Sequence, residues 1–225
     1  MSPDIQIPFV HSYDAIVNQA RSKARESRPT AALVVPSEMD TLRAFVRAAE
    51  EDLIQPLIIG DEALLRKNLE LNSIDIGDTH VIDINQPDMA VQTAARMARA
   101  GEIQVIVQGK LLAADLLSEL FAHEQEFRSP GKTVSHVAVL KPKQYPKLLL
   151  LTDGAVVVQP DLKTKLNLIG NMVYVAEKIG ITSPRLAVVA AVEVVYPQMP
   201  ATMEAAILAK MAERGQIKGA RVDGP

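Results

Sequence analysis

Apolar runs alternate with amphipathic stretches along most of this chain, and polar residues or glycine stand where the runs end. Short runs rich in valine, isoleucine and leucine predict buried strands, whereas apolar residues recurring every three or four positions predict helices. The stretches between most strands have helical spacing, which gives a repeated strand-helix-strand pattern. Strands are predicted at residues 32–35, 55–59, 80–84, 103–107, 134–140, 148–152, 185–193 and 218–223.

Capping signals mark the starts of several predicted helices. Ser12, Asp88 and Asp161 each precede a helical stretch, and we expect each to cap it through a side-chain oxygen. Ser37 with Asp40 three residues later resembles a capping box in which Asp replaces Glu. Helices are predicted to begin near residues 13, 38, 61, 89, 111, 162 and 201.

The alternation predicts an α/β fold with three layers, αβα, around a mostly parallel sheet. Crossover helices must return the chain to the same edge of such a sheet, so they cover both of its faces. A polar, proline-containing stretch at residues 141–146 is the predicted hinge between an N-terminal lobe, 1–143, and a second lobe, 144–225.

Ligands of parallel sheets sit beyond the carboxyl ends of the strands, and this rule selects candidate site residues. A glycine at such a position lets the backbone approach a ligand, but the same residues also serve as ordinary strand-to-helix turns. The selected positions are Gly60 with Asp61, residues 108–110, residues 152–154, Glu193, and Asp223 with Gly224.

Composition and charge exclude several function classes. The 225 residues carry 24 basic and 27 acidic side chains, a formal charge of −3, and no basic block that would indicate a nucleic-acid partner. The absence of cysteine excludes disulfides and thiolate chemistry. No apolar run approaches the length needed to cross a bilayer, so we expect a cytoplasmic protein without membrane contact.

Seven short strings in the second half of the chain carry a family resemblance. They occur in one order and together closely resemble the phosphate acetyltransferase and phosphate butyryltransferase family, and the resemblance extends over the chain from about Tyr13. The strings are Ser135-His136-Val137, residues 151–155 (LTDGA), 159–163 (QPDLK), 190–195 (AAVEVV), Pro200-Ala201-Thr202, residues 210–217 (KMAERGQI) and 222–225 (VDGP).

The resemblance implies the reversible reaction of an acyl-CoA with phosphate to give an acyl phosphate and CoA, with an acetyl or butyryl group. It implies two α/β lobes, like those of isocitrate and isopropylmalate dehydrogenases, and a homodimer. No metal or tightly held cofactor is implied, because coenzyme A is a substrate. Such a reaction needs groups that hold a phosphate dianion, stabilise an oxyanion and manage the thiol proton.

Eight residues are predicted to contact substrate. Arg128 is expected either to clamp phosphate or the CoA diphosphate or to be an exposed loop arginine. Ser135 is expected to donate to a phosphate oxygen, whereas His136 is expected to pack as a structural side chain. Thr152 and Asp153 are expected to contact substrate, with helix capping or an inter-lobe hydrogen bond as the alternative. The eight predicted substrate-binding residues are Gly109, Lys110, Arg128, Ser135, Thr152, Asp153, Glu193 and Asp223.

Glu193 has a structural alternative: a buried carboxylate needs a partner, which Arg185, Lys210 or a main-chain cap could supply, and an ion pair is the default.

Departures from the family pattern also matter. The family commonly has Lys-Gly-Ser, followed two residues later by threonine, where this chain has residues 108–110 (QGK) and then Ala113. Asparagine is usual where this chain has Val157, and also at Tyr196.

Family members continue beyond the point that corresponds to Pro225, so the resemblance predicts a C-terminally truncated member with an incomplete second lobe. The catalytic residues are expected in the absent segment. The alternative function is a noncatalytic remnant of the same fold, used for binding or interaction. A nucleotide-linked dehydrogenase is disfavoured, because no Gly-x-Gly-x-x-Gly follows the first strand.

Overall fold

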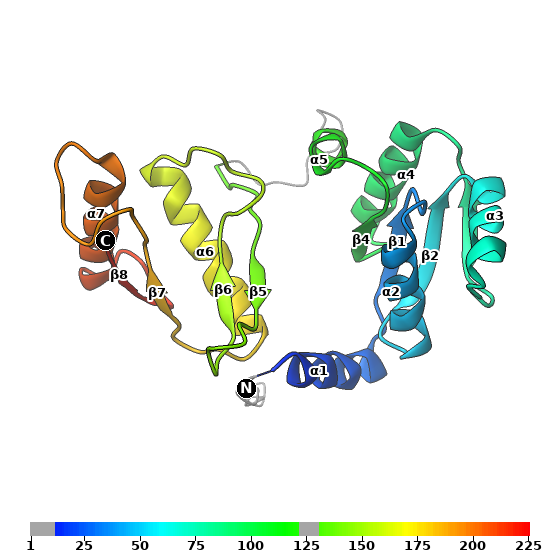
Figure 1. Ribbon diagram of the computed structural model, residues 1–225, viewed down its shortest axis with the longest axis horizontal. Coiled ribbons are helices and arrows are strands. Elements are labelled where there is room, and N and C mark those ends of the chain that lie inside the picture. The colour runs from blue at the N-terminus through cyan, green and yellow to red at the C-terminus, as the bar shows by residue number, and fades with distance from the viewer. Residues whose placement is uncertain (1–11, 122–130) are drawn as a thin grey trace. The chain divides into compact units, whose positions relative to one another are not determined.

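The chain forms two compact units, which Figure 1 draws in the computed structural model. The structure describes residues 12–121 and 131–225. Residues 17–129 make up what we term the N-terminal unit, and residues 1–16 with 130–225 make up the C-terminal unit. The hinge predicted at residues 141–146 lies inside the C-terminal unit, where it connects two strands that pair with each other.

A four-stranded parallel sheet organises the N-terminal unit, in the strand order β3-β2-β1-β4. Leu33 in β1 stands opposite Ile58 in β2 and Val107 in β4. The predicted strands of this unit are confirmed, with ends shifted by at most two residues. The elements are α1 (Tyr13–Glu26), β1 (Thr30–Val34), α2 (Met39–Glu50), β2 (Gln55–Gly60), α3 (Glu62–Asn72), β3 (His80–Asp83), α4 (Pro87–Arg99), β4 (Val105–Gln108) and α5 (Ala113–Leu120).

Helices cover both faces of this sheet, because successive residues of a strand point to opposite sides. Leu33 and Ile58 pack against α2 and α3, whereas Val34 and Ile59 pack against α4 and α5. The three-layer αβα arrangement is therefore confirmed in this unit. The buried helix residues are Leu42, Phe45, Leu65 and Leu69 on the first face, and Ala90, Val91, Ala94 and Leu116 on the second.

Two of the three predicted single-residue caps are confirmed. The Ser12 hydroxyl accepts a hydrogen bond from the backbone N–H of Ala15 at 3.2 Å. Asp161 caps α6 (Leu162–Lys178) by accepting from the N–H of Thr164 at 2.7 Å. Asp88 does not cap α4, because Pro87 can occupy the first helical position and moves the start of the helix back by two residues.

The capping box predicted at Ser37 and Asp40 is wrong. Helix α2 begins one residue later, after Glu38, and no side chain caps its first turn. The N–H of Ser37 donates instead to the carbonyl oxygen of Val35 at 2.8 Å, which keeps Ser37 in the turn that leaves β1. The predicted cap is absent because Ser37 belongs to the turn after β1 and not to the first turn of the helix.

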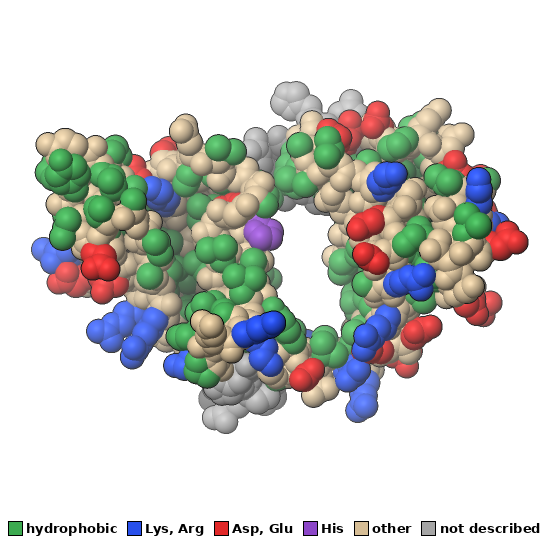
Figure 2. Space-filling model, in the orientation of Figure 1, with side chains coloured by type: hydrophobic (Ala, Val, Ile, Leu, Met, Phe, Trp, Pro, Cys, Tyr) green, Lys and Arg blue, Asp and Glu red, His purple; other side chains and the backbone are tan. Residues whose placement is uncertain are grey.

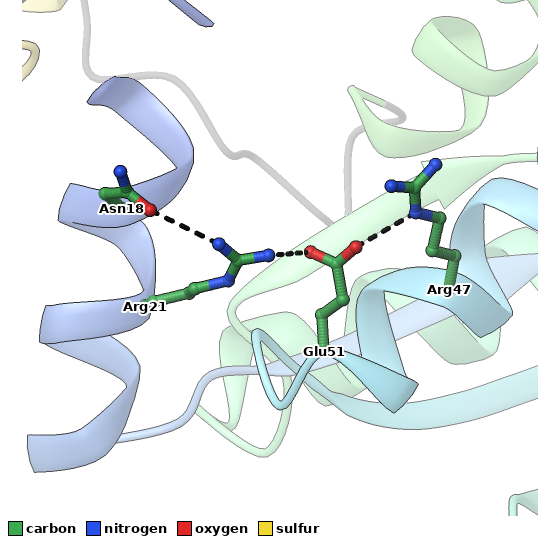
Figure 3. Close-up of polar contacts among 4 residues, drawn as sticks. All are labelled: Asn18, Arg21, Arg47 and Glu51. Atoms are coloured by element: carbon green, nitrogen blue, oxygen red, sulfur yellow. Dashed lines mark hydrogen bonds and ion pairs between the residues drawn. The ribbon is translucent and has the colours of Figure 1, made fainter. Parts of the chain in front are cut away.

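Helix α1 is attached to α2 by charged side chains (Figure 3). Glu51 accepts hydrogen bonds from Arg47 at 2.9 Å and from Arg21 at 2.7 Å, and Arg21 also donates to Asn18 at 3.2 Å. These bonds from Arg47 and Arg21 lower the pKa of Glu51. Since none of the fourteen residues of α1 is buried, this contact supplements a weakly packed helix.

The C-terminal unit contains two small sheets and two long helices. Strands β5 (Ala138–Leu140) and β6 (Leu149–Leu151) pair antiparallel, and β7 (Arg185–Ala187) and β8 (Arg221–Asp223) pair parallel. Its core is formed around α6 and α7 (Pro200–Glu213). The buried core residues are Ile169, Val173, Leu186, Leu208, Ile217 and Val222.

All four strand predictions in this unit are too long, and β6 and β8 keep only three residues each of the predicted 148–152 and 218–223. The strand predicted over 185–193 ends at Ala187, where its ladder with β8 ends. Beyond that point Val189 is 83% exposed and Val194 is 65% exposed, so the apolar run continues without a partner strand. The strand predicted over 134–140 begins at Ala138. Across residues 12–121 and 131–225, no helix has both the length and the apolar character of a bilayer crossing.

Candidate functional site

The parallel sheet has its topological switch point between β1 and β4. The chain steps from β1 to β2 and β3 on one side, whereas β4 pairs with the other side of β1. The predicted residues Gly109 and Lys110 lie here: the N–H of Gly109 donates to the carbonyl of Val34 and that of Lys110 to the carbonyl of Val35, both at 2.9 Å. Ligands of such sheets bind at this place.

The backbone at the switch point is crowded and strained. A Cβ atom on Gly109 would lie 2.0 Å from the carbonyl oxygen of Val35 and 2.6 Å from that of Val34, so only glycine fits. Val35 has a φ of 54°, a left-handed conformation that a β-branched residue rarely adopts. The side chain of Lys110 is exposed and forms no ion pair with the described residues. It therefore offers a free ammonium group.

Asp153, two residues after the end of β6, uses its carboxylate to hold backbone. One oxygen accepts from the N–H of His136 at 2.9 Å, and the other accepts from the N–H groups of Ala155 and Val156 at 2.8 Å each. Burial acts to raise the pKa of Asp153, but N–H donors that include those of Val156, Ala155 and His136 outweigh it and lower the pKa. Of the two roles left open for Asp153, the geometry displays backbone capping.

The lowered pKa of Asp153 predicts a pH dependence of stability. Because the folded-state pKa lies below the ordinary value of 3.8, the contribution is fully present above that value and is lost as the pH falls through the folded pKa. We expect the difference in unfolding free energy between the wild type and Asp153→Asn to shrink below about pH 4. Urea unfolding of both proteins between pH 7 and pH 3 measures it, and a constant difference would contradict the assignment.

Thr152 and His136 lie beside Asp153, and their side-chain polar atoms have no hydrogen-bond partner among the described residues. The hydroxyl oxygen of Thr152 is buried and has no hydrogen-bond partner among the described residues. His136 is exposed, so the prediction that it packs as a structural side chain is wrong. A Cβ on Gly154 would lie 3.9 Å from Nδ1 of His136, which places the imidazole beside this loop.

Two asparagines of α6, which sequence reasoning missed, bind the segment that leads to His136. Nδ2 of Asn171 donates to the carbonyl of Thr133 at 2.9 Å and to the hydroxyl of Ser135 at 2.7 Å. Nδ2 of Asn167 donates to the carbonyl of Gly131 at 3.2 Å and to the hydroxyl of Thr133 at 3.3 Å. Their four-residue spacing on a helix was the available signal, but asparagine pairs also occur on solvated helix faces.

The remaining predicted site residues lie elsewhere in the chain. Arg128 lies outside the described residues. Glu193 is exposed and does not end a strand, and Lys210 pairs with Glu213 at 2.7 Å, so the buried ion pair considered for Glu193 is wrong. Asp223 ends β8 as predicted.

The carboxylate of Asp223 stays close to its own backbone, where it accepts from the N–H of Gly224 at 3.0 Å. The carbonyl of Asp223 accepts from the N–H of Val188 at 2.9 Å. Within the described part of the chain, His, Asp and Glu side chains form no cluster of three that could hold a metal ion. On the face shown in Figure 2, acidic and basic side chains are interspersed.

Comparison with known sequences finds one family over most of the chain. A model of the family described as "Phosphate acetyl/butaryl transferase" matches residues 86–225. A phosphate butyryltransferase from Clostridium acetobutylicum is 33% identical over 217 residues, which cover 96% of this chain and 71% of that protein. A phosphate acetyltransferase from Thermotoga maritima is 34% identical over 212 residues, 94% of this chain and 70% of that protein. A phosphate butyryltransferase from Clostridium beijerinckii is 36% identical over 86% of this chain, which spans 64% of that protein.

Solved structures with the same fold include two phosphotransacylases. A branched-chain phosphotransacylase from Enterococcus faecalis superposes with a TM-score of 0.68 at 23% identity, over 88% of this chain and 68% of that chain. A phosphotransacetylase from Streptococcus pyogenes gives a TM-score of 0.69 at 17% identity, over 94% and 73%. At these identities the likeness establishes the α/β fold.

Proposed function

Since the chain belongs to the phosphate acetyl/butyryl transferase family, we propose that it exchanges an acyl group between coenzyme A and phosphate. The observation that carries this proposal is the similarity to a butyryltransferase over 96% of the chain and to an acetyltransferase over 94%. Because both kinds of relative match at nearly the same identity, the proposed acyl group is acetyl or butyryl. The shape of the acyl pocket decides between them.

The reaction places three demands on the protein. A phosphate oxygen attacks the thioester carbonyl carbon, a carbon–oxygen bond forms, the carbon–sulfur bond breaks, and the proton lost by phosphate ends on the sulfur of CoA. Cationic and hydrogen-bonding groups must hold the phosphate, and donors must stabilise the oxyanion at the carbonyl carbon. A group that titrates near neutral pH suits the proton transfer.

The two sites offer suitable groups. In the N-terminal unit, we assign the free ammonium of Lys110 and the backbone of Gly109 to an anionic part of the substrate. In the C-terminal unit, the hydroxyls of Ser135 and Thr152 are the assigned donors. Asp153 already accepts three backbone N–H groups, which makes it a poor proton acceptor, so we assign it the shaping of the loop.

Other assignments rest on the sequence alone. These include the substrate contacts of Arg128, Glu193 and Asp223, and a cytoplasmic location. A homodimer is part of the proposal and has partial support in α7. There Met203 and Ile207, four residues apart on one helix face, are 37% and 42% exposed, and burial of this face against a second copy would be favourable.

The proposed function is tested by mixing the purified protein with acetyl-CoA or butyryl-CoA and measuring thiol release. We expect release that depends on added phosphate, and the ratio of the two rates reports the preferred acyl group. Calorimetric titration with CoA and with acetyl phosphate adds a binding readout. The noncatalytic alternative predicts that neither compound binds, and that result, with no phosphate-dependent release, would overturn the proposal.

A further inference from the structure

Residues 131–136, which precede β5, are held by side chains of other elements. We term these residues the strap. Their hydrogen bonds with Asn167, Asn171 and Asp153 take the place that strand pairing would otherwise have. Backbone outside helices and sheets also needs partners for its polar groups, and here three side chains supply them.

The spacing of the two asparagines matches the spacing of the strap. Four residues of an α-helix rise about 6 Å, a distance that two residues of chain outside a helix can also span. Asn167 accordingly reaches the hydroxyl of Thr133, and Asn171 reaches the hydroxyl of Ser135 two residues further on. One turn of α6 therefore matches two residues of the strap, so each asparagine meets its own hydroxyl.

The direction of these hydrogen bonds determines what the hydroxyls can do. A side-chain amide nitrogen carries two hydrogens, and Asn167 and Asn171 each use both on the strap. The hydroxyl oxygens of Thr133 and Ser135 accept, so each keeps its own proton free to donate. Asn167 and Asn171 lie four residues apart on one face of α6, so the two hydroxyls that they bind lie against the same face.

Asp153 holds the other end of the strap. Its carboxylate accepts the N–H of His136, the residue after Ser135. Ser135 is therefore fixed through its side chain by Asn171 and through the adjacent backbone by Asp153. A hydroxyl held in this way loses little freedom when it binds an anion.

We infer that Asn167 and Asn171 are positioning residues that fix the hydroxyls of Thr133 and Ser135 as paired donors to the oxygens of the phosphate substrate. Phosphate oxygens are acceptors, and a hydroxyl donating to a charged oxygen makes one of the stronger hydrogen bonds in proteins. The ligand assignment rests on the proposed function. The asparagines act on phosphate only through the hydroxyls.

The test measures inorganic phosphate binding by calorimetry, and the KM values for phosphate and acyl-CoA, in Ser135→Ala, Asn171→Ala and the double variant. We expect each single change to weaken phosphate binding about tenfold, which corresponds to about 1.4 kcal/mol. The double variant should bind no more weakly than Ser135→Ala, because Asn171 acts through Ser135. The KM for acyl-CoA should stay within about twofold. Unchanged phosphate binding in Asn171→Ala, or multiplying effects in the double variant, would overturn the inference.

Further variants separate positioning from folding. Asn171→Asp keeps the size of the side chain but can only accept, so the Ser135 proton turns toward it and the phosphate affinity should fall as in Asn171→Ala. Thr133→Val removes the other hydroxyl at constant shape and should weaken phosphate binding with an unchanged melting temperature. Lys163→Ala, an exposed change on the same helix, is the matched control and should leave phosphate binding unchanged.

The outcomes for the two proposals are distinguishable. A wild-type protein that binds phosphate without turnover overturns the proposed function and leaves the inference standing. A wild-type protein that exchanges acyl groups while all strap variants keep its KM for phosphate overturns the inference alone. A wild-type protein that neither binds phosphate nor exchanges acyl groups overturns both.

Discussion

Replacement of Gly109 by alanine is expected to lower the free energy of unfolding by about 3 kcal/mol, at the upper end of the usual cost of overpacking. The added Cβ would lie 2.0 Å from the carbonyl oxygen of Val35 and 2.6 Å from that of Val34. Both atoms belong to backbone at the end of a central strand, so no flexible side chain can move aside. The hydrogen bonds from Gly109 and Lys110 to these carbonyls should break as the chain separates.

Gly170→Ala is the control for this prediction. Gly170 lies within α6, and a Cβ there would meet no atom within 4 Å. Alanine costs less conformational entropy than glycine in a helix, so the variant should gain about 0.5–1 kcal/mol. Urea unfolding followed by circular dichroism measures both proteins. If Gly109→Ala unfolds at the wild-type urea concentration, the steric account of Gly109 is wrong.

Replacement of Asp153 by alanine is expected to cost about 2 kcal/mol, because three backbone N–H groups lose a charged acceptor. Partial exposure of this site lets water replace some of the lost bonds, which keeps the cost below the sum of three. The strap should also become more mobile at His136, because the N–H of His136 loses its hydrogen bond to the Asp153 carboxylate. Urea unfolding gives the stability, and amide hydrogen exchange at His136, Ala155 and Val156 gives the local effect.

Asp161→Ala provides a matched comparison in the same unit. Asp161 also binds backbone, but it caps a helix through one N–H, that of Thr164, so its removal leaves fewer backbone donors without an acceptor. Asp153→Ala should therefore cost more than Asp161→Ala and should accelerate exchange at His136. Equal costs, or unchanged exchange at His136, would show that Asp153 does not hold the strap.

The fold of the N-terminal unit could be predicted from the sequence because its central strands are covered on both faces. Residues 31–34 and 57–59 are almost fully apolar and almost fully buried, so the apolar run and the strand coincide. The run at 185–193 is equally apolar, yet only its first three residues form a strand. A strand also needs a neighbouring strand to pair with its backbone N–H and C=O groups, and a single sequence does not show where that pairing ends.

The candidate site was predicted in part. The rule that ligands bind beyond the ends of parallel strands selected Gly109, Lys110 and Asp153. Gly109 and Lys110 follow β4 of the parallel sheet, whereas Asp153 follows β6, which pairs antiparallel, so the rule applies only to the first two. The sequence could not indicate that the carbonyl oxygen of Val34, in the neighbouring strand β1, leaves no room for a side chain at position 109. It also could not reveal Asn167 or Asn171, because their partners lie more than thirty residues away in the chain.

The left-handed backbone of Val35 has a consequence for how the N-terminal unit would receive a ligand. Such a conformation costs on the order of 1–3 kcal/mol, and it persists because neighbouring contacts impose it. The carbonyl oxygen of Val35 accepts hydrogen bonds from the N–H groups of both Ser37 and Lys110. This one atom therefore joins the loop after β1 to the loop after β4. The free energy needed to form this strained loop is therefore supplied when the protein folds. An anion that binds here would meet backbone already in its final conformation, so little reorganisation would oppose binding.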